Sequence, residues 1–445
     1  MSNPQSLPER ARYVRDQLPA HGLFAGATWR ISPEPFPISP DLLAKLIALG
    51  PQLLAFHRAC NVMYRHSIQG KLPTWIAEYL DAGKPKELVE FSRRDRFKSH
   101  VPRVIRPDVI LTDDHFFISE LDSVPGGIGL TAWLGKTYSE LGYEVVGGAR
   151  GMMDGFGAIL QAEAKDKQLP AVVAVSEEAA TYRPEMEWLG QQMGFRVLRP
   201  EELAPFDKKE VVYRFFELFD LPNIPNAAAL MDAAAHGQIA VTPPFKPQLE
   251  EKMLLAFLWM EQLRPFWREQ LGEATLAALR EVFPYTWILD PTPLPPHAVI
   301  PELGIHDWRE MAKFSQKHRE LVLKISGFNE RAWGSRGVHV GHDLPAKEWA
   351  QAIEQALANF AAQPFILQRF EKSKLFESQY MDFEADTVRP FSARVRLCPY
   401  YFVVGDDAKL GGILATVCPA DKKILHGMPD AVMSPCYSRP IIPSP

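Results

Sequence analysis

The segment between residues 104 and 122 restricts the fold more than any other part of the sequence. It contains two short runs, VIRPDVIL and HFFISEL, that are rich in β-branched and aromatic residues. A polar turn, TDD, joins them, and this pattern predicts a β-hairpin. Residues two positions apart face the same side of a strand. Arg106 and Asp108 therefore share one face of the first strand. Glu120 and Asp122 likewise share one face of the second.

Four charged side chains on one face of a hairpin are costly to bury unless they pair with one another or bind a metal. Asp108, Glu120 and Asp122 supply hard oxygen ligands, the type that holds Mg²⁺ together with substrate phosphates. A solvent-exposed hairpin face would explain the same pattern. The segment by itself favours neither interpretation.

A second segment, residues 321–341, reads LVLKISGFNERAWGSRGVHVG and places Lys324 inside an apolar strand. The glycines that follow let backbone N–H groups come close to an anion, and a lysine beneath such a loop supplies a point charge for phosphate. An ordinary long hairpin with an exposed lysine is the alternative. The apolar neighbours of Lys324 disfavour it, because an unpaired lysine is rarely placed between buried residues.

A third set of residues follows later in the chain. The strand PFILQRFE leads into a polar segment, so its backbone around Gln368 could pair with the edge of an adenine base. Arg394 and Arg396 are two positions apart in a predicted strand and share one face, where they could hold a phosphate or a developing anion. A surface ladder of ion pairs is the alternative interpretation.

The charge balance and the cysteines narrow the functional class. The chain has 49 Lys and Arg against 54 Asp and Glu, a net charge of −5, which argues against a broad nucleic-acid surface. No apolar stretch reaches the roughly 18 residues that span a bilayer, and the charged N-terminus predicts no secretory signal. The four cysteines are far apart, as expected for reduced thiols. We expect a cytoplasmic protein without nucleic-acid or membrane partners.

The apolar pattern predicts an α/β or α+β fold with a helical N-terminal region. Residues 1–100 are mostly helical, with a break predicted at Gly50-Pro51. Strands and helices alternate through residues 170–245, which indicates a small parallel α/β layer. From Glu320 onward the sequence is rich in strands. Three residues of the α/β layer suit either substrate recognition or a structural role: Tyr182, Glu185 and Arg214.

Two glycine patterns near the hairpin resemble nucleotide-binding motifs but lack the required context. Residues 127–132 (GIGLTA) match the dinucleotide fingerprint G-x-G-x-x-A. That fingerprint needs a parallel βαβ unit with an acidic residue for the ribose, and neither is evident. The run from Gly129 to Thr137 has five residues between its glycines, one too many for a P-loop. His339 and His342 indicate a loop pair, because no third metal ligand is near them in the sequence.

Taken together, the three segments resemble the ATP-grasp ligases, in the circularly permuted branch that contains glutathionylspermidine synthetase. In that branch the metal-binding strand precedes the nucleotide-binding lysines, and here the Glu120-x-Asp122 motif precedes Lys324. The resemblance covers roughly residues 100–440 and implies a circularly permuted ATP-grasp fold of the α/β (α+β) class. It implies four parts: a helical N-terminal region (1–100), the metal-binding part of the permuted fold (101–165), a small α/β substrate or pre-grasp domain (166–247) and the nucleotide-binding subdomains (248–445).

The resemblance implies a metal and phosphate site on the predicted hairpin. Asp108, Glu120 and Asp122 fall on the family's Mg²⁺ ligands. Arg106 falls on the arginine that contacts the transferring phosphate. Three arginines are expected to act in catalysis: Arg106, Arg394 and Arg396. Asp122 stands where the family commonly has asparagine, which keeps a ligand but adds a negative charge.

The resemblance also implies a nucleotide site. Lys252, in LEEKMLLAFLW, resembles the helix lysine that reaches the nucleotide, and Lys324 resembles the strand lysine on the α- and β-phosphates. Gln368 and its neighbours would form the hinge against adenine. Four residues of the loop that closes over ATP complete the expected set: Gly334, Ser335, Arg336 and Gly337. The segment FNERAW enlarges this loop relative to the family pattern.

The implied activity is that of an ATP-dependent carboxylate–amine ligase that works through an acylphosphate. MgATP would bind between the subdomains, and the substrates would be a small-molecule carboxylate and an amine. A small-molecule kinase would use the same residues, as would a nucleotide-binding protein without activity. An NAD-dependent dehydrogenase is a further alternative if residues 127–132 form a true fingerprint. The sequence predicts neither the individual substrates nor the oligomeric state.

Overall fold

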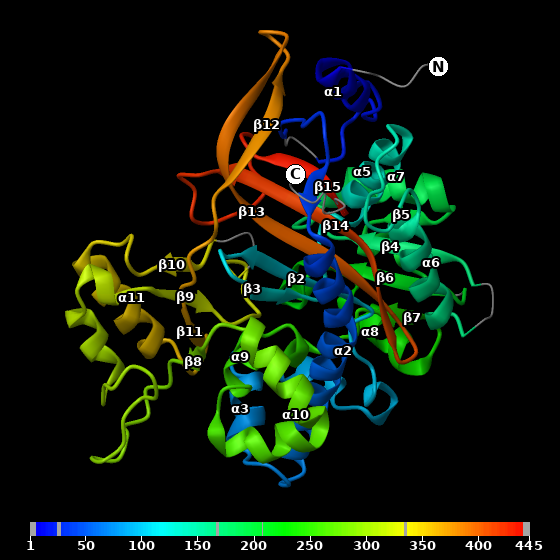
Figure 1. Ribbon diagram of the computed structural model, residues 1–445. Coiled ribbons are helices and arrows are strands. Elements are labelled where there is room, and N and C mark those ends of the chain that lie inside the picture. Colours follow the sequence, from blue (N-terminus) through cyan, green and yellow to red (C-terminus); the bar gives the residue numbers. More distant parts are fainter. Residues whose placement is uncertain (1–5, 25–27, 166–168, 207, 333–335, 439–445) are drawn as a thin grey trace. The chain divides into compact units, whose positions relative to one another are not determined.

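The computed structural model of the chain describes residues 6–24, 28–165, 169–206, 208–332 and 336–438. The chain folds into two compact units (Figure 1). Unit 1 comprises Met1–Leu54, His100–Pro244 and Ser373–Pro445, and unit 2 comprises Ala55–Ser99 and Phe245–Lys372. The first hundred residues therefore contribute to both units.

A seven-stranded sheet dominates unit 1. Its strands follow the order β1-β15-β14-β13-β2-β3, and β12 pairs with the first part of β13. All neighbours are antiparallel except β1 and β15, which are parallel. The strands are β1 (Phe36–Ile38), β2 (Val104–Leu111), β3 (Phe116–Asp122), β12 (Phe376–Asp382), β13 (Thr387–Val404), β14 (Asp407–Pro419) and β15 (Val432–Ser438).

β13 is long enough to pair with different strands along different parts of its length. From Ala393 onward it pairs with β14, whereas residues 387–392 pair with β12 alone among the described strands. A two-stranded ribbon of β12 and β13 therefore extends beyond the rest of the sheet (Figure 1).

Three helices of unit 1 pack between the large sheet and a small parallel sheet of order β5-β4-β6-β7. Val173 and Tyr213 of the small sheet share one apolar core with α5, α6 and α7, and this core also includes Tyr400 and Leu414 of the large sheet. The small parallel α/β layer predicted from the sequence is confirmed. The elements are β4 (Ala171–Val175), β5 (Arg196–Leu198), β6 (Val211–Phe215), β7 (Ala240–Thr242), α5 (Ile128–Glu140), α6 (Gly151–Glu163), α7 (Arg183–Met193) and α8 (Ala227–His236), and the N-terminal helix of the unit is α1 (Leu7–Asp16).

The helical character of the N-terminal region is confirmed, but the break predicted at Gly50-Pro51 is wrong. Helix α2 (Pro40–Ile68) continues through both residues. Gly50 is required by packing, because a Cβ there would lie 2.6 Å from the carbonyl oxygen of Ala408 and 2.7 Å from the ring of Tyr401. Pro51 removes one backbone donor. Tertiary packing on either side of that turn keeps the helix in register.

A four-stranded antiparallel sheet of order β10-β9-β11-β8 forms the centre of unit 2. Leu323 and Leu367 of this sheet share an apolar core with Trp349 of α11. Because side chains alternate along a strand, Lys324 and Gln368 lie on the opposite face. The elements of unit 2 are β8 (Thr286–Ile288), β9 (Leu321–Ile325), β10 (Val338–Val340), β11 (Phe365–Arg369), α3 (Trp75–Asp81), α4 (Lys86–Ser92), α9 (Met253–Phe257), α10 (Arg264–Val282) and α11 (Ala346–Ala358).

Short 3₁₀ helices complete the described part of the chain. They are η1 (Asp95–Phe97), η2 (Ala180–Tyr182), η3 (Pro200–Leu203), η4 (Leu218–Asn223), η5 (Pro247–Leu249), η6 (Glu261–Leu263), η7 (Trp308–Lys313) and η8 (Gln316–His318). Among the helices described, none has the length and apolar character needed to cross a membrane.

Candidate functional site

The predicted hairpin forms, with β2 and β3 as its strands. In its register Arg106 lies opposite Asp122, and two positions further Asp108 lies opposite Glu120. Directly opposed residues of an antiparallel pair point to the same side. The four charged side chains therefore share one face, as predicted. The next strand, β13, brings Arg396 to Asp108.

Two arginines and two aspartates form an ion-pair network on this face. Nη2 of Arg106 lies 3.1 Å from Oδ1 of Asp108 and 3.0 Å from Oδ2 of Asp122. Nη1 of Arg396 lies 2.9 Å from Oδ2 of Asp108. The Asp108 side chain is only 9% exposed, so the alternative of a solvent-exposed hairpin face is wrong. We call Arg106, Asp108, Asp122 and Arg396 the arginine–aspartate cluster.

The two carboxyl groups of the cluster have pKa values shifted in opposite directions. Burial alone would raise the pKa of Asp108, but the charges of Arg106 and Arg396 bring it below its ordinary value. Burial raises the pKa of Asp122 above its ordinary value, since Arg106 offsets only part of this effect and the charge of Glu120 adds to it. Asp108 is therefore held as a carboxylate, whereas Asp122 takes up a proton more readily.

Both arginines of the cluster keep donors that the described residues leave unsatisfied. The Nε atoms of Arg106 and Arg396 are buried and have no hydrogen-bond partner within the described ranges. Their side chains are still 13% and 16% exposed, so part of each guanidinium group is accessible. A buried donor without an acceptor costs free energy. An anionic oxygen at the accessible part of each guanidinium group would accept charge-assisted hydrogen bonds.

The predicted magnesium ligands are only partly arranged for a metal. In the described part of the chain, no group of three or more His, Cys, Asp or Glu side chains is placed to hold a metal ion. Asp108 is engaged by both arginines, which leaves Glu120 and Asp122 as the less buried carboxylates. Mg²⁺ in nucleotide sites is commonly held by one or two carboxylates with phosphates and water. The chemistry of these two donors fits that arrangement, and the three-ligand set remains a prediction.

Arg394 lies two residues before Arg396 on β13 but has different partners. Its Nη1 donates to the carbonyl oxygen and to Oγ of Ser373, at 2.6 and 2.9 Å. Its Nε donates to the carbonyl oxygen of Ala420 at 2.9 Å. These contacts tie two chain segments to the strand and do not involve the arginine–aspartate cluster. A catalytic role for Arg394 remains a prediction.

Glu185 of α7 holds the loop that follows β3. Its two carboxylate oxygens accept hydrogen bonds from the backbone N–H groups of Gly127 and Leu130, both at 2.7 Å. Burial raises the pKa of Glu185 to about 7, although these hydrogen bonds act in the opposite direction. The carbonyl oxygen of the neighbouring Gly126 accepts a hydrogen bond from Nη1 of Arg106 at 3.3 Å. Glu185 therefore supports the loop on which Arg106 rests.

The glycine pattern at residues 127–132 has a packing role in this loop. A Cβ at Gly129 would lie 2.2 Å from the carbonyl oxygen of Glu185, and Gly127 adopts a φ of +88°. The preceding strand, β3, is antiparallel to its neighbour, and Glu185 already occupies N–H groups at the start of α5. A dinucleotide fingerprint requires a parallel βαβ unit with those N–H groups directed at a pyrophosphate.

Arg214 of β6, another candidate for substrate recognition, has a structural role. It is fully buried. Its guanidinium group donates to the carbonyl oxygens of Phe216, Pro243 and Pro244. These contacts hold the chain that leaves the small parallel sheet.

In unit 2, the sheet face opposite α11 contains the predicted strand lysine. Lys324 lies in β9 and is 7% exposed, so the alternative of a hairpin with an exposed lysine is wrong. Its Nζ donates to Oε1 of Gln368 at 2.8 Å, and Nε2 of Gln368 donates to Oγ1 of Thr286 at 3.3 Å. The Gln368 amide therefore orients Lys324. The adenine hinge around Gln368 remains a prediction.

Lys252 lies at the start of α9, beside the end of β9. Its backbone N–H donates to the carbonyl oxygen of Ser326 at 2.8 Å, and its Nζ donates to the carbonyl oxygen of Ala332 at 2.7 Å. The long helix that the sequence pattern predicts from Gln248 to about Val282 is divided, and α9, directly after Lys252, has only five residues. Ser326 follows β9 directly, so the structure brings Lys252 and Lys324 to the same end of one strand.

The loop predicted to close over a nucleotide is described in part. Gly334 and Ser335 lie outside the described residues. Arg336 is exposed. Gly337 is buried, and a Cβ there would lie 2.6 Å from the carbonyl oxygen of Arg331. The chain then enters β10, so the loop returns to the sheet as predicted.

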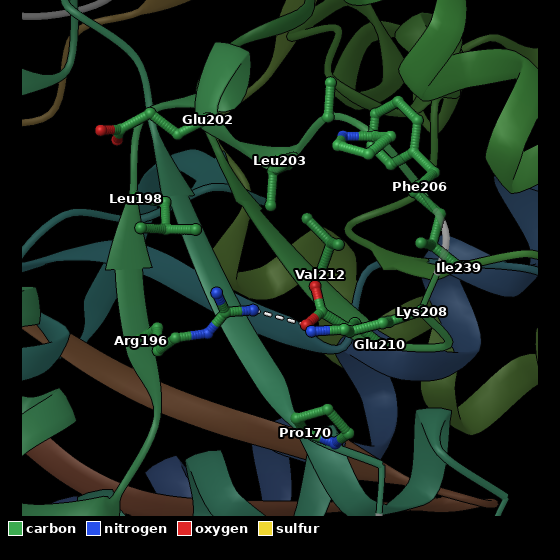
Figure 2. A pocket seen from close by; sticks show the side chains of 12 residues that line it. Pro170, Arg196, Leu198, Glu202, Leu203, Phe206, Lys208, Glu210, Val212 and Ile239 are labelled. Atoms are coloured by element: carbon green, nitrogen blue, oxygen red, sulfur yellow. Dashed lines mark hydrogen bonds and ion pairs between the residues drawn. The ribbon is translucent and has the colours of Figure 1, made fainter.

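A separate cavity of about 510 Å³ lies at the small parallel sheet of unit 1 (Figure 2). Its wall combines charged and apolar side chains, with Leu203, Val212 and Ile239 among the apolar ones. An ion pair between Arg196 and Glu210, at 2.5 Å, lies on the same wall. None of the predicted site residues that the structure describes lines this cavity.

Comparison with known proteins identifies the fold. No family model matches the sequence, and no curated protein matches it. The structure is similar to that of a glutathione synthetase-like effector from Globodera pallida in its apo form, with a TM-score of 0.59 and 14% identity over 99% of this chain and 98% of that one. A putative gamma-glutamylcysteine synthetase from Methylobacillus flagellatus KT matches more weakly, with a TM-score of 0.39 and 11% identity over 88% of each chain. The chain therefore has a mixed α/β fold like that of the glutathione synthetase-like effector.

Proposed function

We propose that this protein is an ATP-dependent carboxylate–amine ligase that forms an amide bond through an acylphosphate. The observation that carries the proposal is the arginine–aspartate cluster. Two guanidinium groups, one from β2 and one from β13, are held on one sheet face and still have exposed surface. The fold is that of a glutathione synthetase-like effector, which supports the same chemistry.

In this proposal, Arg106 and Arg396 stabilise negative charge on the phosphoryl group in transfer. Charge-assisted hydrogen bonds from fixed donors are the main way in which a protein accelerates such a step. Arg106 is fixed by Asp108, Asp122 and the carbonyl oxygen of Gly126. It therefore needs little reorganisation when charge develops near it.

Glu120 and Asp122 would hold Mg²⁺ together with phosphate oxygens. When bound, the ion would neutralise charge on the phosphates of ATP. Asp122 is 23% exposed and its Oδ1 accepts a hydrogen bond from the backbone N–H of Val124 at 2.9 Å. That contact and the ion pair of Oδ2 with Arg106 keep the carboxylate in place.

Lys324 and Lys252 would bind the phosphates of the nucleotide. Lys324 is a compact positive charge oriented by Gln368, and Lys252 reaches the carbonyl oxygen of Ala332 in the loop after β9. Because an ammonium group in an apolar strand is strongly stabilised by an anion, this placement favours phosphate binding.

The chemistry would proceed in two steps. An oxygen of the substrate carboxylate attacks the γ-phosphorus of ATP, and the bond to ADP breaks to give an acylphosphate. The amine then attacks the acyl carbon, phosphate leaves with the bonding electrons, and the amine loses a proton. No side-chain nucleophile is required. The protein's task is to bind, orient and exclude water.

The test begins with nucleotide binding. Thermal unfolding of the purified chain is followed with ATP plus Mg²⁺, with NAD and with GTP. A ligand at one hundred times its Kd stabilises the folded state by about 2.7 kcal/mol, so ATP with Mg²⁺ should raise the Tm by a few degrees. Stabilisation by NAD and none by ATP would contradict the proposal.

Turnover is then measured with pools of small carboxylates and amines. The expected result is ADP and free phosphate in equal amounts, together with a product whose mass equals acid plus amine minus water. ADP formation with the phosphate retained on the product, and no need for an amine, would identify a kinase instead.

A further inference from the structure

A sealed ion pair connects the N-terminal part of unit 2 to the proposed nucleotide lysines. Nζ of Lys84, in the loop between α3 and α4, lies 2.5 Å from Oε1 of Glu251. The two side chains are 1% and 2% exposed. Burying two charges costs free energy that only good geometry and further hydrogen bonds offset. The second oxygen of Glu251 meets that need by accepting a hydrogen bond from the hydroxyl of Ser326.

Ser326 transmits this contact to the start of α9. Its carbonyl oxygen accepts the backbone N–H of Lys252 at 2.8 Å, and its Oγ accepts the backbone N–H of Met253 at 3.0 Å. Ser326 is also two residues after Lys324 on the same chain segment. The ion pair thus fixes the start of the helix that carries Lys252 against the end of the strand that carries Lys324.

The backbone closes tightly around the pair. A Cβ at Gly327 would lie 2.7 Å from the carbonyl oxygen of Glu250 and 2.8 Å from the carboxyl carbon of Glu251. A Cβ at Gly83 would lie 1.9 Å from the carbonyl oxygen of Ala362. These contacts leave no space for bulkier residues beside Lys84 and Glu251.

The start of the loop after β9 is held at the same place. Nε2 of Gln363 donates to the carbonyl oxygen of Gly327 at 2.9 Å, and Nδ2 of Asn329 donates to Oε1 of Gln363 at 2.6 Å. Lys84 itself lies 5.7 Å from the centre of the Phe328 ring. One connected network therefore holds the start of α9 beside Lys252 and the start of the loop that follows Lys324.

We propose that Lys84 and Glu251 are positioning residues for nucleotide binding: they set the place of Lys252 and of the loop that follows β9 without touching the nucleotide. This inference rests on the proposed function for the identity of the ligand. It assigns a role to residues 55–99, which supply Lys84 to the network.

The experiment compares three variants of the full chain: Lys84→Met, Glu251→Gln and the double variant. Each single change leaves one charge sealed without its partner. The double variant is neutral and keeps an acceptor for the hydroxyl of Ser326. The matched control pair is Lys86→Met and Glu90→Gln, which makes the same substitutions in an exposed pair of the next helix.

Two readouts are needed. The first is hydrogen exchange of the backbone amides of residues 252–257 and 327–332, which requires no nucleotide. We expect about tenfold faster exchange in the single variants and no change in the controls. The second is steady-state kinetics, where KM for ATP should rise about tenfold while kcat changes by less than about threefold.

The double variant separates positioning from simple stability. A positioning role predicts that it regains the thermal stability of the wild type while KM for ATP stays raised. Recovery of both quantities would overturn the inference. If the wild type binds no nucleotide, the proposed function fails. The exchange data then decide alone: unchanged exchange at 252–257 and 327–332 overturns the positioning role, and faster exchange supports it.

Discussion

Two groups of paired charges in this protein have the same chemistry and opposite accessibility. The arginine–aspartate cluster of unit 1 shares two guanidinium groups between carboxylates, and its side chains are 9–23% exposed. The Lys84–Glu251 pair of unit 2 is a single contact, 1–2% exposed. A shared, partly exposed network can exchange a partner for a ligand. A sealed pair can only hold its surroundings in place.

The difference also concerns what each group is attached to. The cluster lies on a sheet face, and both of its arginines have a donor that no described residue satisfies. The sealed pair is joined to a backbone N–H group through the hydroxyl of Ser326, so it fixes the geometry of the main chain. We infer that accessibility, more than the presence of charge, separates binding residues from positioning residues here.

The largest expected effect is the loss of stability when one partner of the Lys84–Glu251 pair is removed. Removing one partner of a buried ion pair leaves an uncompensated charge, so Lys84→Met should lower the free energy of unfolding by about 3–5 kcal/mol. Urea denaturation measures this change, and the Lys86→Met control should stay within about 0.5 kcal/mol. A loss below about 1 kcal/mol for Lys84→Met would mean that water reaches the pair.

The next largest effect is a loss of turnover when the arginine–aspartate cluster is changed. Arg106→Ala should lower kcat by about 100- to 1,000-fold, because it removes a fixed donor from the group in transfer. Asp108 keeps Arg396, so the fold should be retained. The matched control is Arg150→Ala, which alters an exposed pair with Asp154. Unchanged turnover in the Arg106 variant would remove this residue from the proposed mechanism.

A pH experiment tests Glu185, which supports the loop on which Arg106 rests. Glu185 has a folded pKa of about 7, raised by burial from 4.5. Its contribution to stability is fully present below pH 4.5 and is lost as pH rises through 7. Between pH 4.5 and pH 7 the free energy of unfolding of the wild type should fall by about 3 kcal/mol relative to that of Glu185→Gln, at 1.36 kcal/mol for each pKa unit.

The Glu185 prediction is checked by urea denaturation at several pH values. Glu187→Gln, an exposed change on the same helix, should leave the pH dependence of the wild type intact. Parallel stability curves for the wild type and Glu185→Gln would show that the Glu185 carboxyl is not perturbed.

The smallest effect is expected from the matched change in the partly exposed arginine–aspartate cluster. Asp122→Asn makes the same carboxylate-to-amide substitution as Glu251→Gln. Asn keeps an oxygen for the backbone N–H of Val124, so the unfolding free energy should fall by about 1 kcal/mol or less. Equal losses in the Asp122 and Glu251 variants would break the distinction between the two groups of charges.

Local patterns in the sequence were sufficient for the hairpin and for the strand lysine. Alternation placed four charges on one face, and apolar neighbours predicted the burial of Lys324. Both depend on residues a few positions apart. The Gly50-Pro51 break failed because packing against Ala408 and Tyr401 overrode a local preference.

The supporting residues could not be predicted in the same way. Lys84 and Glu251 are 167 positions apart, and Glu185 caps a backbone segment that lies 58 residues earlier. Nothing in the local pattern of either segment identifies its partner. A signal was present at Glu251, which is a charged residue within a largely buried stretch, and such residues usually have partners. Lys84 lies among exposed residues and gave no such signal.

The ribbon of β12 and β13 also affects the self-association of this protein. Along residues 387–392 one edge of β13 has no strand beside it among the described strands. An open edge is a template on which another chain can add a strand. Pro390 has no N–H to offer at that edge, and Arg389 next to it is charged. These two residues make the ribbon a poor seed for aggregation.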